Sequence, residues 1–221
     1  GSLRARPDVD LNAYYLLALN EQPSISVIDP IIGFGGSKLL AMVLLKSPGE
    51  DWVLLSNRSK LFVSMPAANQ VAVVDTTTWK VTTNIETGIK PARLALQPDE
   101  KYVWVANDTG VTVIDTATLK VAKEIATGSG QHEIRFGSDN KFAFVTNRDD
   151  GTLSIIDVPK LKKHKDVKTG GVASSLAFSP LSKALYVTDE VDGSIAVVDA
   201  ASHKLLAKIA AKPGLKTVRF S

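Results

Sequence analysis

Short runs of apolar residues alternate with polar turns along almost the whole chain. The runs are rich in Val, Ile, Leu, Tyr and Phe, and they are bounded by Gly, Pro, Asn or Asp. This pattern is typical of β-strands joined by tight turns, and no segment shows the sustained 3.6-residue period of an amphipathic helix. The sequence therefore predicts an all-β protein built from many short strands.

The apolar runs recur as an internal repeat. Its clearest marker is an apolar run that ends in aspartate, in the segments SISVIDP, QVAVVDT, GVTVIDT, TLSIIDV and SIAVVDA. The aspartates are spaced by 46, 40, 42 and 42 residues, at Asp29, Asp75, Asp115, Asp157 and Asp199. Further apolar runs flank each marker, and four strands in about forty residues is the content of one β-propeller blade.

The repeats resemble the YVTN family of β-propeller repeats. The resemblance is carried by FAFVTNRDDGTLSIIDV, ALYVTDEVDGSIAVVDA and PARLALQPDEKYVWVANDTGVTVIDTATLKVAKEIATG, and it extends over about residues 14–221. It implies a β-propeller, and also a periplasmic or extracellular location, because the family includes bacterial periplasmic and archaeal surface proteins. Family members usually have more blades than the five repeats of this chain.

We predict one propeller of five four-stranded antiparallel blades over residues 14–221, after a flexible segment over residues 1–13. The repeats are placed at about 14–50, 51–91, 92–131, 132–172 and 173–214. The first repeat lacks an innermost strand, and residues 215–221 contain KTVRF, which has the pattern of one. Joining this C-terminal strand to the first blade would close the ring and remove exposed sheet edges, so a monomer is expected. A longer propeller cut after an innermost strand would show the same ends.

Composition and charge exclude several classes of function. The 221 residues include no cysteine, which excludes disulfides, thiolate chemistry and covalent c-type haem attachment within the chain. The net charge of +3 is a weak basic bias that would tolerate an anionic partner. No apolar run is long enough for a transmembrane segment, and no interleaving of aromatic and basic residues indicates nucleic-acid binding. The expected partner is therefore an unknown protein or a small anionic ligand.

Candidate site residues are expected at the mouth of the central channel, where the innermost strands begin. We align these strands on Val53, Leu94, Ile134, Leu176 and Val218. The predicted ligand-binding residues are Asp51, Trp52, Arg93, His132, Glu133, Arg135, Lys216 and Arg219. Because arginine forks suit carboxylate or phosphate, this group predicts a pocket for an anion or a cofactor. Alternatively, the polar residues simply line a water-filled channel.

No catalytic residue, metal ligand set or cofactor is predicted. His132 and Glu133 alone provide too few metal ligands, since three or four are normally required, and Asp51 across the channel could supply a third. The two neighbours cannot form a catalytic dyad either, because adjacent residues on a strand point to opposite faces. The sequence therefore favours a non-catalytic binding or interaction scaffold.

Two other functions are kept as alternatives. Propellers related to the YVTN repeats include lactonases, amine dehydrogenase subunits and haem d1 domains, so the resemblance also allows a cofactor-binding or redox-associated protein. His132 would then be an axial haem ligand, and haem carboxylates would pair with Arg93, Arg135 and Arg219. The chain would otherwise be a structural domain of a larger surface protein.

Several repeated features have structural explanations. The repeat aspartates are expected to bind backbone amides two residues on and so fix the next turn. Trp79 and Leu119 occupy equal positions of the repeat, so Trp79 is expected to serve packing, and Trp104 to fill space between blades. The turns NDTG, NRDDG and DEVDG are expected to be hairpins rather than calcium loops. Lysines on the opposite face could dock an acidic surface or remain solvated.

Overall fold

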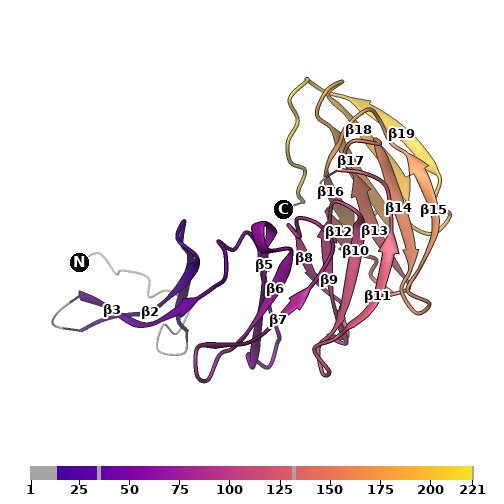
Figure 1. Cartoon of the computed structure of the whole chain (residues 1–221). Helices are drawn as coiled ribbons and strands as arrows, with labels where there is room; N and C mark the ends of the chain where they lie inside the picture. The colour runs from indigo at the N-terminus through magenta and orange to yellow at the C-terminus, as the bar shows by residue number, and fades with distance from the viewer. Residues whose placement is uncertain (1–13, 34–35, 131–132, 221) are drawn as a thin grey trace, which may run out of the picture.

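The computed structural model describes residues 14–33, 36–130 and 133–220 and shows the all-β architecture expected from the repeats. Five antiparallel sheets follow one another along the chain and lie side by side in an arc (Figure 1). The first sheet has three strands and each of the others has four, ordered in space as in the sequence. This is the strand order of β-propeller blades. No helix in the described part of the chain is long and apolar enough to cross a membrane.

The strands have the following bounds. The first blade contains β1 (Leu16–Leu19), β2 (Ser24–Gly33) and β3 (Gly36–Leu44). The second contains β4 (Trp52–Leu54), β5 (Lys60–Met65), the 3-10 turn η2 (Pro66–Ala68), β6 (Gln70–Asp75) and β7 (Lys80–Glu86). The third contains β8 (Leu94–Leu96), β9 (Tyr102–Asn107), β10 (Gly110–Asp115) and β11 (Val121–Ala126). The fourth contains β12 (Ile134–Phe136), β13 (Phe142–Asn147), β14 (Thr152–Asp157) and β15 (Lys162–Lys168). The fifth contains β16 (Ala173–Ser179), β17 (Ala184–Asp189), β18 (Ser194–Asp199) and β19 (Leu205–Ala210).

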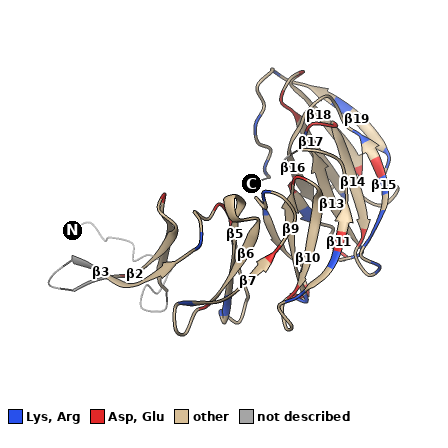
Figure 2. Ribbon diagram, in the orientation of Figure 1, with Lys and Arg blue, Asp and Glu red and all other residues tan. Residues whose placement is uncertain are grey.

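Burial follows the position of each strand in its blade. The middle strands, such as β9 and β10, are buried along most of their length because neighbouring blades cover both of their faces. Their sequences are accordingly near-continuous apolar runs. The outermost strands are more exposed, and charged side chains gather on β15, with Lys123 and Glu124 on β11 and a single lysine on β19 (Figure 2). Charge on an edge strand disfavours pairing with another chain.

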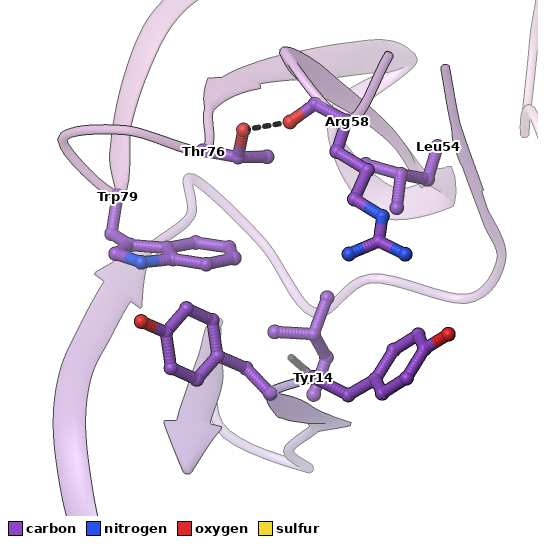
Figure 3. Close-up of a pocket in the computed structure, with 7 residues that line it drawn as sticks. Tyr14, Leu54, Arg58, Thr76 and Trp79 are labelled. Carbon is purple, nitrogen blue, oxygen red and sulfur yellow. Dashed lines mark hydrogen bonds between the residues drawn. The ribbon is translucent and has the colours of Figure 1, made fainter. Parts of the chain in front are cut away.

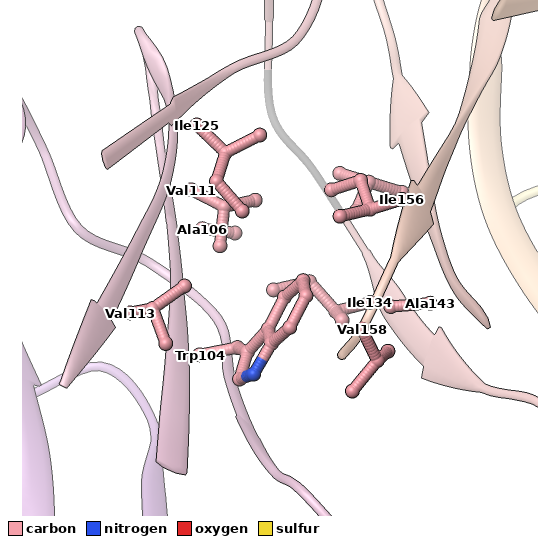
Figure 4. Close-up of a cluster of buried hydrophobic side chains, with 10 residues drawn as sticks. Trp104, Ala106, Val111, Val113, Ile125, Ile134, Ala143, Ile156 and Val158 are labelled. Carbon is pink, nitrogen blue, oxygen red and sulfur yellow. The ribbon is translucent and has the colours of Figure 1, made fainter. Parts of the chain in front are cut away.

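The hydrophobic core is divided among the junctions between blades. Trp104 on β9 is fully buried between the third and fourth blades, and the prediction that it fills this space is confirmed. Figure 4 shows its ring lying between Val113 on one side and Ile134 and Val158 on the other. Its indole nitrogen donates a hydrogen bond to Gln97 Oε1 at 3.0 Å, so its one polar atom is satisfied.

In the second to fifth blades the repeat aspartates fix the turn before the outermost strand, as predicted, whereas Asp29 lies within β2. Asp75 Oδ1 accepts hydrogen bonds from the amides of Thr77 and Thr78, both at 2.8 Å. Asp115 Oδ1 binds the amides of Ala117 and Thr118 in the same way, at 3.0 and 2.7 Å. These bonds favour the ionised carboxylates, and the amides of Thr78 and Thr118 are the main causes that lower the pKa of Asp75 and of Asp115.

Each of these turns ends in a residue with left-handed backbone that packs on the preceding blade. The position is filled by Trp79, Leu119, Leu161 and His203, with φ of 53°, 56°, 47° and 58°. The first three pack against the hydrophobic clusters at their junctions, so the packing role predicted for Trp79 is confirmed. His203 is 5% exposed, and its ring meets Phe142 edge to face with centroids 4.5 Å apart.

His203→Leu is expected to stabilise the protein, and more strongly in acid. Burial is the main cause that lowers the pKa of His203 below 6.5, and Lys165 and His164 add to it, although a hydrogen bond with the backbone of Ala200 and the charge of Asp199 oppose them. A histidine with a depressed folded-state pKa contributes full stability above its unfolded pKa and loses it as the pH falls through the folded value. Leucine fills the same turn position in the third and fourth blades, so it should fit here.

The measurement is urea unfolding of both proteins at pH 7.5 and pH 5.5. His203 Nε2 has no hydrogen-bond partner among the described residues, and such a buried atom costs about 1–3 kcal/mol. We therefore expect the leucine variant to be more stable by about 1 kcal/mol at pH 7.5 and by more at pH 5.5. An equal loss of stability in the two proteins on acidification would contradict the role given to His203.

The C-terminal segment does not form the expected closing strand. Residues 211–220 lie in no strand, and β1 pairs with β2 alone among the described strands. The segment instead follows β16, where Ser174 Oγ donates to Leu215 O at 3.1 Å and Val218 N donates to Ser175 Oγ at 3.4 Å. The first and fifth blades lie at opposite ends of the arc (Figure 1), so in this arrangement these residues do not meet β1.

Candidate functional site

Two polar hollows lie where the innermost strands begin. The larger, of about 350 Å³, is lined by Glu50, Ala92, Arg93, Glu133, Arg148, Ser174, Glu190 and Lys216. The other, of about 290 Å³, is lined by Asp51, Arg93, Leu94, Glu133, Ile134, Arg135 and Arg219. Arg93 and Glu133 belong to both, so the hollows adjoin, and we call them together the channel site.

The structure brings most of the predicted site residues together. Six of them line the channel site, namely Asp51, Arg93, Glu133, Arg135, Lys216 and Arg219. They come from the starts of β4, β8 and β12 and from the C-terminal segment. Trp52 does not join them, because it packs on the hydrophobic cluster between the first and second blades. His132 lies outside the described residues.

The different place of Trp52 follows from a one-residue error in the predicted strand alignment. Trp52 pairs with Val63, whereas Leu94 pairs with Val105. The two valines are equivalent, because each lies opposite the residue three positions before the repeat aspartate of its blade. Leu94 therefore corresponds to Trp52 and not to Val53. The segment WVLL has adjacent apolar residues, so either alignment satisfied the apolar pattern.

The corrected register adds a residue that was not predicted from the sequence. Side chains on a strand alternate between faces, so a shift of one position exchanges the residues that face the channel. Glu50 thereby takes the position that Ala92, Ser174 and Lys216 hold in other repeats, and all four line the same hollow. Glu50 could have been identified from the sequence by counting residues back from the second strand of each blade, instead of aligning the apolar residues of the innermost strands.

Two ion pairs organise one side of the channel site. Arg135 lies 3.0 Å from Glu133, two residues before it on the same chain segment. Arg148 lies 2.8 Å from Glu190, and this pair joins the turns after β13 and β17. These turns were predicted as hairpins on the face of the channel mouth, and the ion pair between them was not predicted. The side chains in both pairs are about one-quarter to two-fifths exposed, so we assign each about 0–1 kcal/mol of stability.

The other three cations of the channel site do not take part in such ion pairs among the described residues. Within the described ranges, Arg93, Lys216 and Arg219 form no ion pair. Asp51 Oδ2 instead accepts a hydrogen bond from the amide of Leu94 at 2.9 Å, which joins the second blade to the third. Because an arginine stays charged in a protein, the site keeps donors and positive charge that these ion pairs do not use.

The residue that ends the second strand of a blade holds the preceding connection in place. Asn147 Oδ1 accepts a hydrogen bond from the amide of Gly128 at 2.9 Å, and Asp189 Oδ2 accepts one from Gly171. Asn107 lies so close to Gly88 that a Cβ there would be 2.2 Å from its Oδ1. These buried side chains fix the loops from which the channel site is built, a role that was not predicted from the sequence.

Comparison with known proteins supports the architecture. The sequence matches the family model described as YNCE-like beta-propeller over residues 49–124 and 110–218. A comparison with curated proteins found no match. Similar solved structures include Kuenenia stuttgartiensis hydrazine synthase, with a TM-score of 0.67 and 17% identity over 81% of this chain and 58% of that chain. Dihydro-heme d1 dehydrogenase NirN in complex with DHE has a TM-score of 0.70 and 16% identity over 88% of this chain and 44% of that one. At these identities the likeness concerns the fold, and this chain spans only about half of each structure.

Proposed function

Because the chain belongs to the YNCE-like β-propeller family, we propose that it is a non-catalytic binding scaffold that holds an anionic ligand or partner at the channel site. A propeller fold does not assign chemistry by itself, so the proposal depends on the residues of the site. The observation that carries it is the convergence of Arg93, Lys216 and Arg219 on two adjoining hollows.

The chemistry of the site favours a small ligand with more than one acidic group. Guanidinium groups bind carboxylate and phosphate through paired hydrogen bonds, and the lysine adds a point charge. The cations come from two separate segments, since Arg93 precedes β8 while Lys216 and Arg219 lie near the C-terminus. The volume of about 350 Å³ lies at the lower end of the range of about 300–1,000 Å³ for small-molecule pockets, and that of about 290 Å³ lies just below it.

Arg93→Gln tests this proposal, because Arg93 lines both hollows. Calorimetric titration with citrate and with inorganic phosphate at low salt should show saturable binding to the unmodified protein. The variant should bind at least about tenfold more weakly, since a hydrogen bond to a charged group contributes about 1.5–3 kcal/mol. Lys123→Gln, on the exposed strand β11, removes the same charge away from the site and should leave binding unchanged. Binding that is absent, or equal in the two variants, would contradict the proposal.

A cofactor-binding propeller is the second candidate. It is favoured by Arg93, Arg135 and Arg219, which line one hollow and could pair with the carboxylates of a tetrapyrrole. Neither hollow is lined by a histidine within the described part of the chain, so an axial ligand would have to be His132. The described residues thus fit only the carboxylates of such a group. A Soret band on adding haem, lost in His132→Ala, would favour this candidate over the scaffold.

We also infer that the propeller ring closes when residues 216–220 pair with β1. The hydrogen bond from Val218 N to Ser175 Oγ repeats the one from Leu94 N to Asp51 Oδ2, with equivalent residues in each. The C-terminal segment therefore already has the register of an innermost strand. Both end blades also expose apolar side chains that closure would cover, with Leu16 55%, Met42 53%, Leu44 72% and Ile209 47% exposed.

A pair of cysteines would test closure in this cysteine-free chain. Ala18 pairs with Ser26, and Ser26 lies three residues before the repeat aspartate Asp29. Ala18 is therefore equivalent to Val63 and Val105, and it should face Val218 in a closed ring. Paired strands place opposite Cα atoms about 4.5–5.5 Å apart, within reach of a disulfide. Oxidation of the Ala18→Cys, Val218→Cys protein should give a cross-linked monomer. A cross-linked dimer, or no cross-link, would contradict closure within one chain.

We propose that the protein is periplasmic or extracellular. The YVTN resemblance implies the periplasm or the extracellular space, and the same resemblance allows a structural domain of a larger surface protein. A channel site that binds a soluble anion is compatible with either. Fractionation of cells that express the natural gene, with detection by antibody, would test the location directly.

A further inference from the structure

A third cavity lies between the first and second blades, at the end of the blades opposite the channel site. It has a volume of about 190 Å³ and is lined by Tyr14, Tyr15, Leu17, Leu54, Arg58, Thr76 and Trp79. These residues come from the start of β1, from the turn between β4 and β5 and from the turn between β6 and β7. We call this cavity the aromatic pocket.

Aromatic rings and one cation form the sides of the aromatic pocket. Figure 3 shows Trp79 on one side and Arg58 on the other, with the guanidinium directed toward Tyr14. The rings of Tyr15 and Trp79 meet edge to face, with centroids 6.1 Å apart. The guanidinium carbon of Arg58 lies 4.9 Å from the centre of the Tyr14 ring, a cation–π contact. The pocket thus offers flat apolar walls beside a group of planar N–H donors.

The backbone of Arg58 is fixed before any ligand binds. Its φ is 56°, its amide donates to Leu55 O at 2.8 Å, and its carbonyl accepts a hydrogen bond from Thr76 Oγ1 (Figure 3). The amide of Thr76 also donates to Ser59 O at 3.3 Å, which ties the two turns of the second blade together. The backbone that carries the guanidinium is therefore already ordered, so binding need not pay the entropic cost of ordering this turn.

The chemistry of the aromatic pocket is not a consequence of the repeat. An equivalent cavity of about 270 Å³ lies between the fourth and fifth blades, where the lining includes Lys141, Lys183 and Asp139 beside three phenylalanines. The residue there that corresponds to Arg58 is Ser182. Arg58 lies two residues before Lys60, which pairs with Asp75, and Ser182 lies two residues before Ala184, which pairs with Asp199. Among the residues that the structure describes, Arg58 is the one charged residue that lines the aromatic pocket. Within the described ranges, the combination of aromatic walls and a single cation thus distinguishes the first junction from the one between the fourth and fifth blades.

We propose that the aromatic pocket binds a small aromatic carboxylate. The guanidinium pairs with the carboxylate, and the ring of the ligand packs against the tyrosine and tryptophan rings. A volume of about 190 Å³ is below the range of about 300–1,000 Å³ for drug-sized ligands, so the ligand has a single ring system. This site shares no lining residue with the channel site and does not depend on the function proposed there.

The test is calorimetric titration of the full chain with 4-hydroxybenzoate. Two analogues separate the contributions, because 4-hydroxybenzamide lacks the charge and cyclohexanecarboxylate lacks the aromatic ring. The benzoate should bind saturably at one site, and each analogue should bind about tenfold more weakly or worse. Arg58→Gln should weaken binding of the benzoate by about ten- to a hundredfold.

Trp79→Leu provides a second variant that keeps the fold. Leucine occupies the equivalent turn position in the third and fourth blades, so the change removes an aromatic wall without an unfamiliar residue. It should also weaken binding, with an unchanged circular dichroism spectrum and thermal midpoint within a few degrees. Arg93→Gln is the matched control, and it should bind the benzoate like the unmodified protein.

Four results would overturn the proposal. The first is that the unmodified protein shows no saturable binding up to the solubility of 4-hydroxybenzoate, and the second is that it binds 4-hydroxybenzoate and 4-hydroxybenzamide with equal affinity. The third is that Arg58→Gln binds 4-hydroxybenzoate as well as the unmodified protein does. The fourth is that Arg93→Gln alone loses affinity for 4-hydroxybenzoate. The last result would assign the probe to the channel site, and it would leave the function proposed there intact.

Discussion

Replacing Trp104 by alanine should lower the free energy of unfolding by about 3–5 kcal/mol. The side chain is fully buried and contributes to the cluster between the third and fourth blades. Its ring also meets Phe136 edge to face, with centroids 5.3 Å apart. The blades on either side are held by their own strand pairings and cannot collapse into the space without breaking register, so a cavity would remain. Urea unfolding at neutral pH measures the loss.

Trp104→Phe is the control, because phenylalanine occupies the equivalent positions Phe62 and Phe144 in the neighbouring blades. It keeps most of the apolar volume but leaves Gln97 Oε1, on a residue only 3% exposed, without its donor. We expect a loss of about 1–3 kcal/mol, smaller than for alanine. Equal losses in the two variants, or a loss below about 1 kcal/mol for alanine, would show that the junction repacks freely.

Much of the fold could be predicted because each blade repeats the same physical solution. The runs YVWVAN and GVTVID are mostly apolar, since blades cover both faces of the middle strands, and the aspartate that ends the second run fixes the next turn. The innermost strands are harder to align, because they are only three residues long in the second, third and fourth blades. Two apolar residues in succession, as at Trp52 and Val53, then leave the register undetermined.

The candidate sites depend on contacts that a repeat pattern does not contain. Arg93 and Glu133 could be placed at the channel because polar residues directly precede their strands. Arg148 and Glu190 belong to hairpin turns, and their ion pair across neighbouring blades becomes visible only when the blades are packed together. The aromatic pocket was missed for the same reason. Its residues are far apart in sequence, and the equivalence of Trp79 with leucine indicated packing alone.

The second large effect is expected at Asp189, which ends β17 and is 3% exposed. Its Oδ1 accepts hydrogen bonds from the amides of Val191 and Asp192 at 2.9 and 3.2 Å. Its Oδ2 binds the amides of Gly171 and Val172, the latter at 3.3 Å. Asp189→Ala would leave these amides without an acceptor and free the loop before β16. We expect a loss of about 2–4 kcal/mol in the free energy of unfolding at pH 7.

Asp189→Asn separates this structural role from the charge. Asparagine occupies the equivalent positions Asn107 and Asn147 in the third and fourth blades, so it should keep the loop and cost less than about 1 kcal/mol at pH 7. Burial alone would raise the pKa of Asp189, but hydrogen bonds from the amides of Gly171 and Val191, with others, outweigh it and lower the pKa below 3.8.

The lowered pKa gives Asp189 a signature in acid. A carboxylate with a depressed folded-state pKa contributes its stability above the unfolded pKa and loses it as the pH falls through the folded value. The natural protein should therefore lose more stability than Asp189→Asn when urea unfolding is compared at pH 7 and at pH 3. If asparagine and alanine were equally damaging at pH 7, the hydrogen bonds to the loop would not be the reason for the buried aspartate. If the natural protein and Asp189→Asn lost stability equally between pH 7 and pH 3, the ionisation of Asp189 would not contribute to stability.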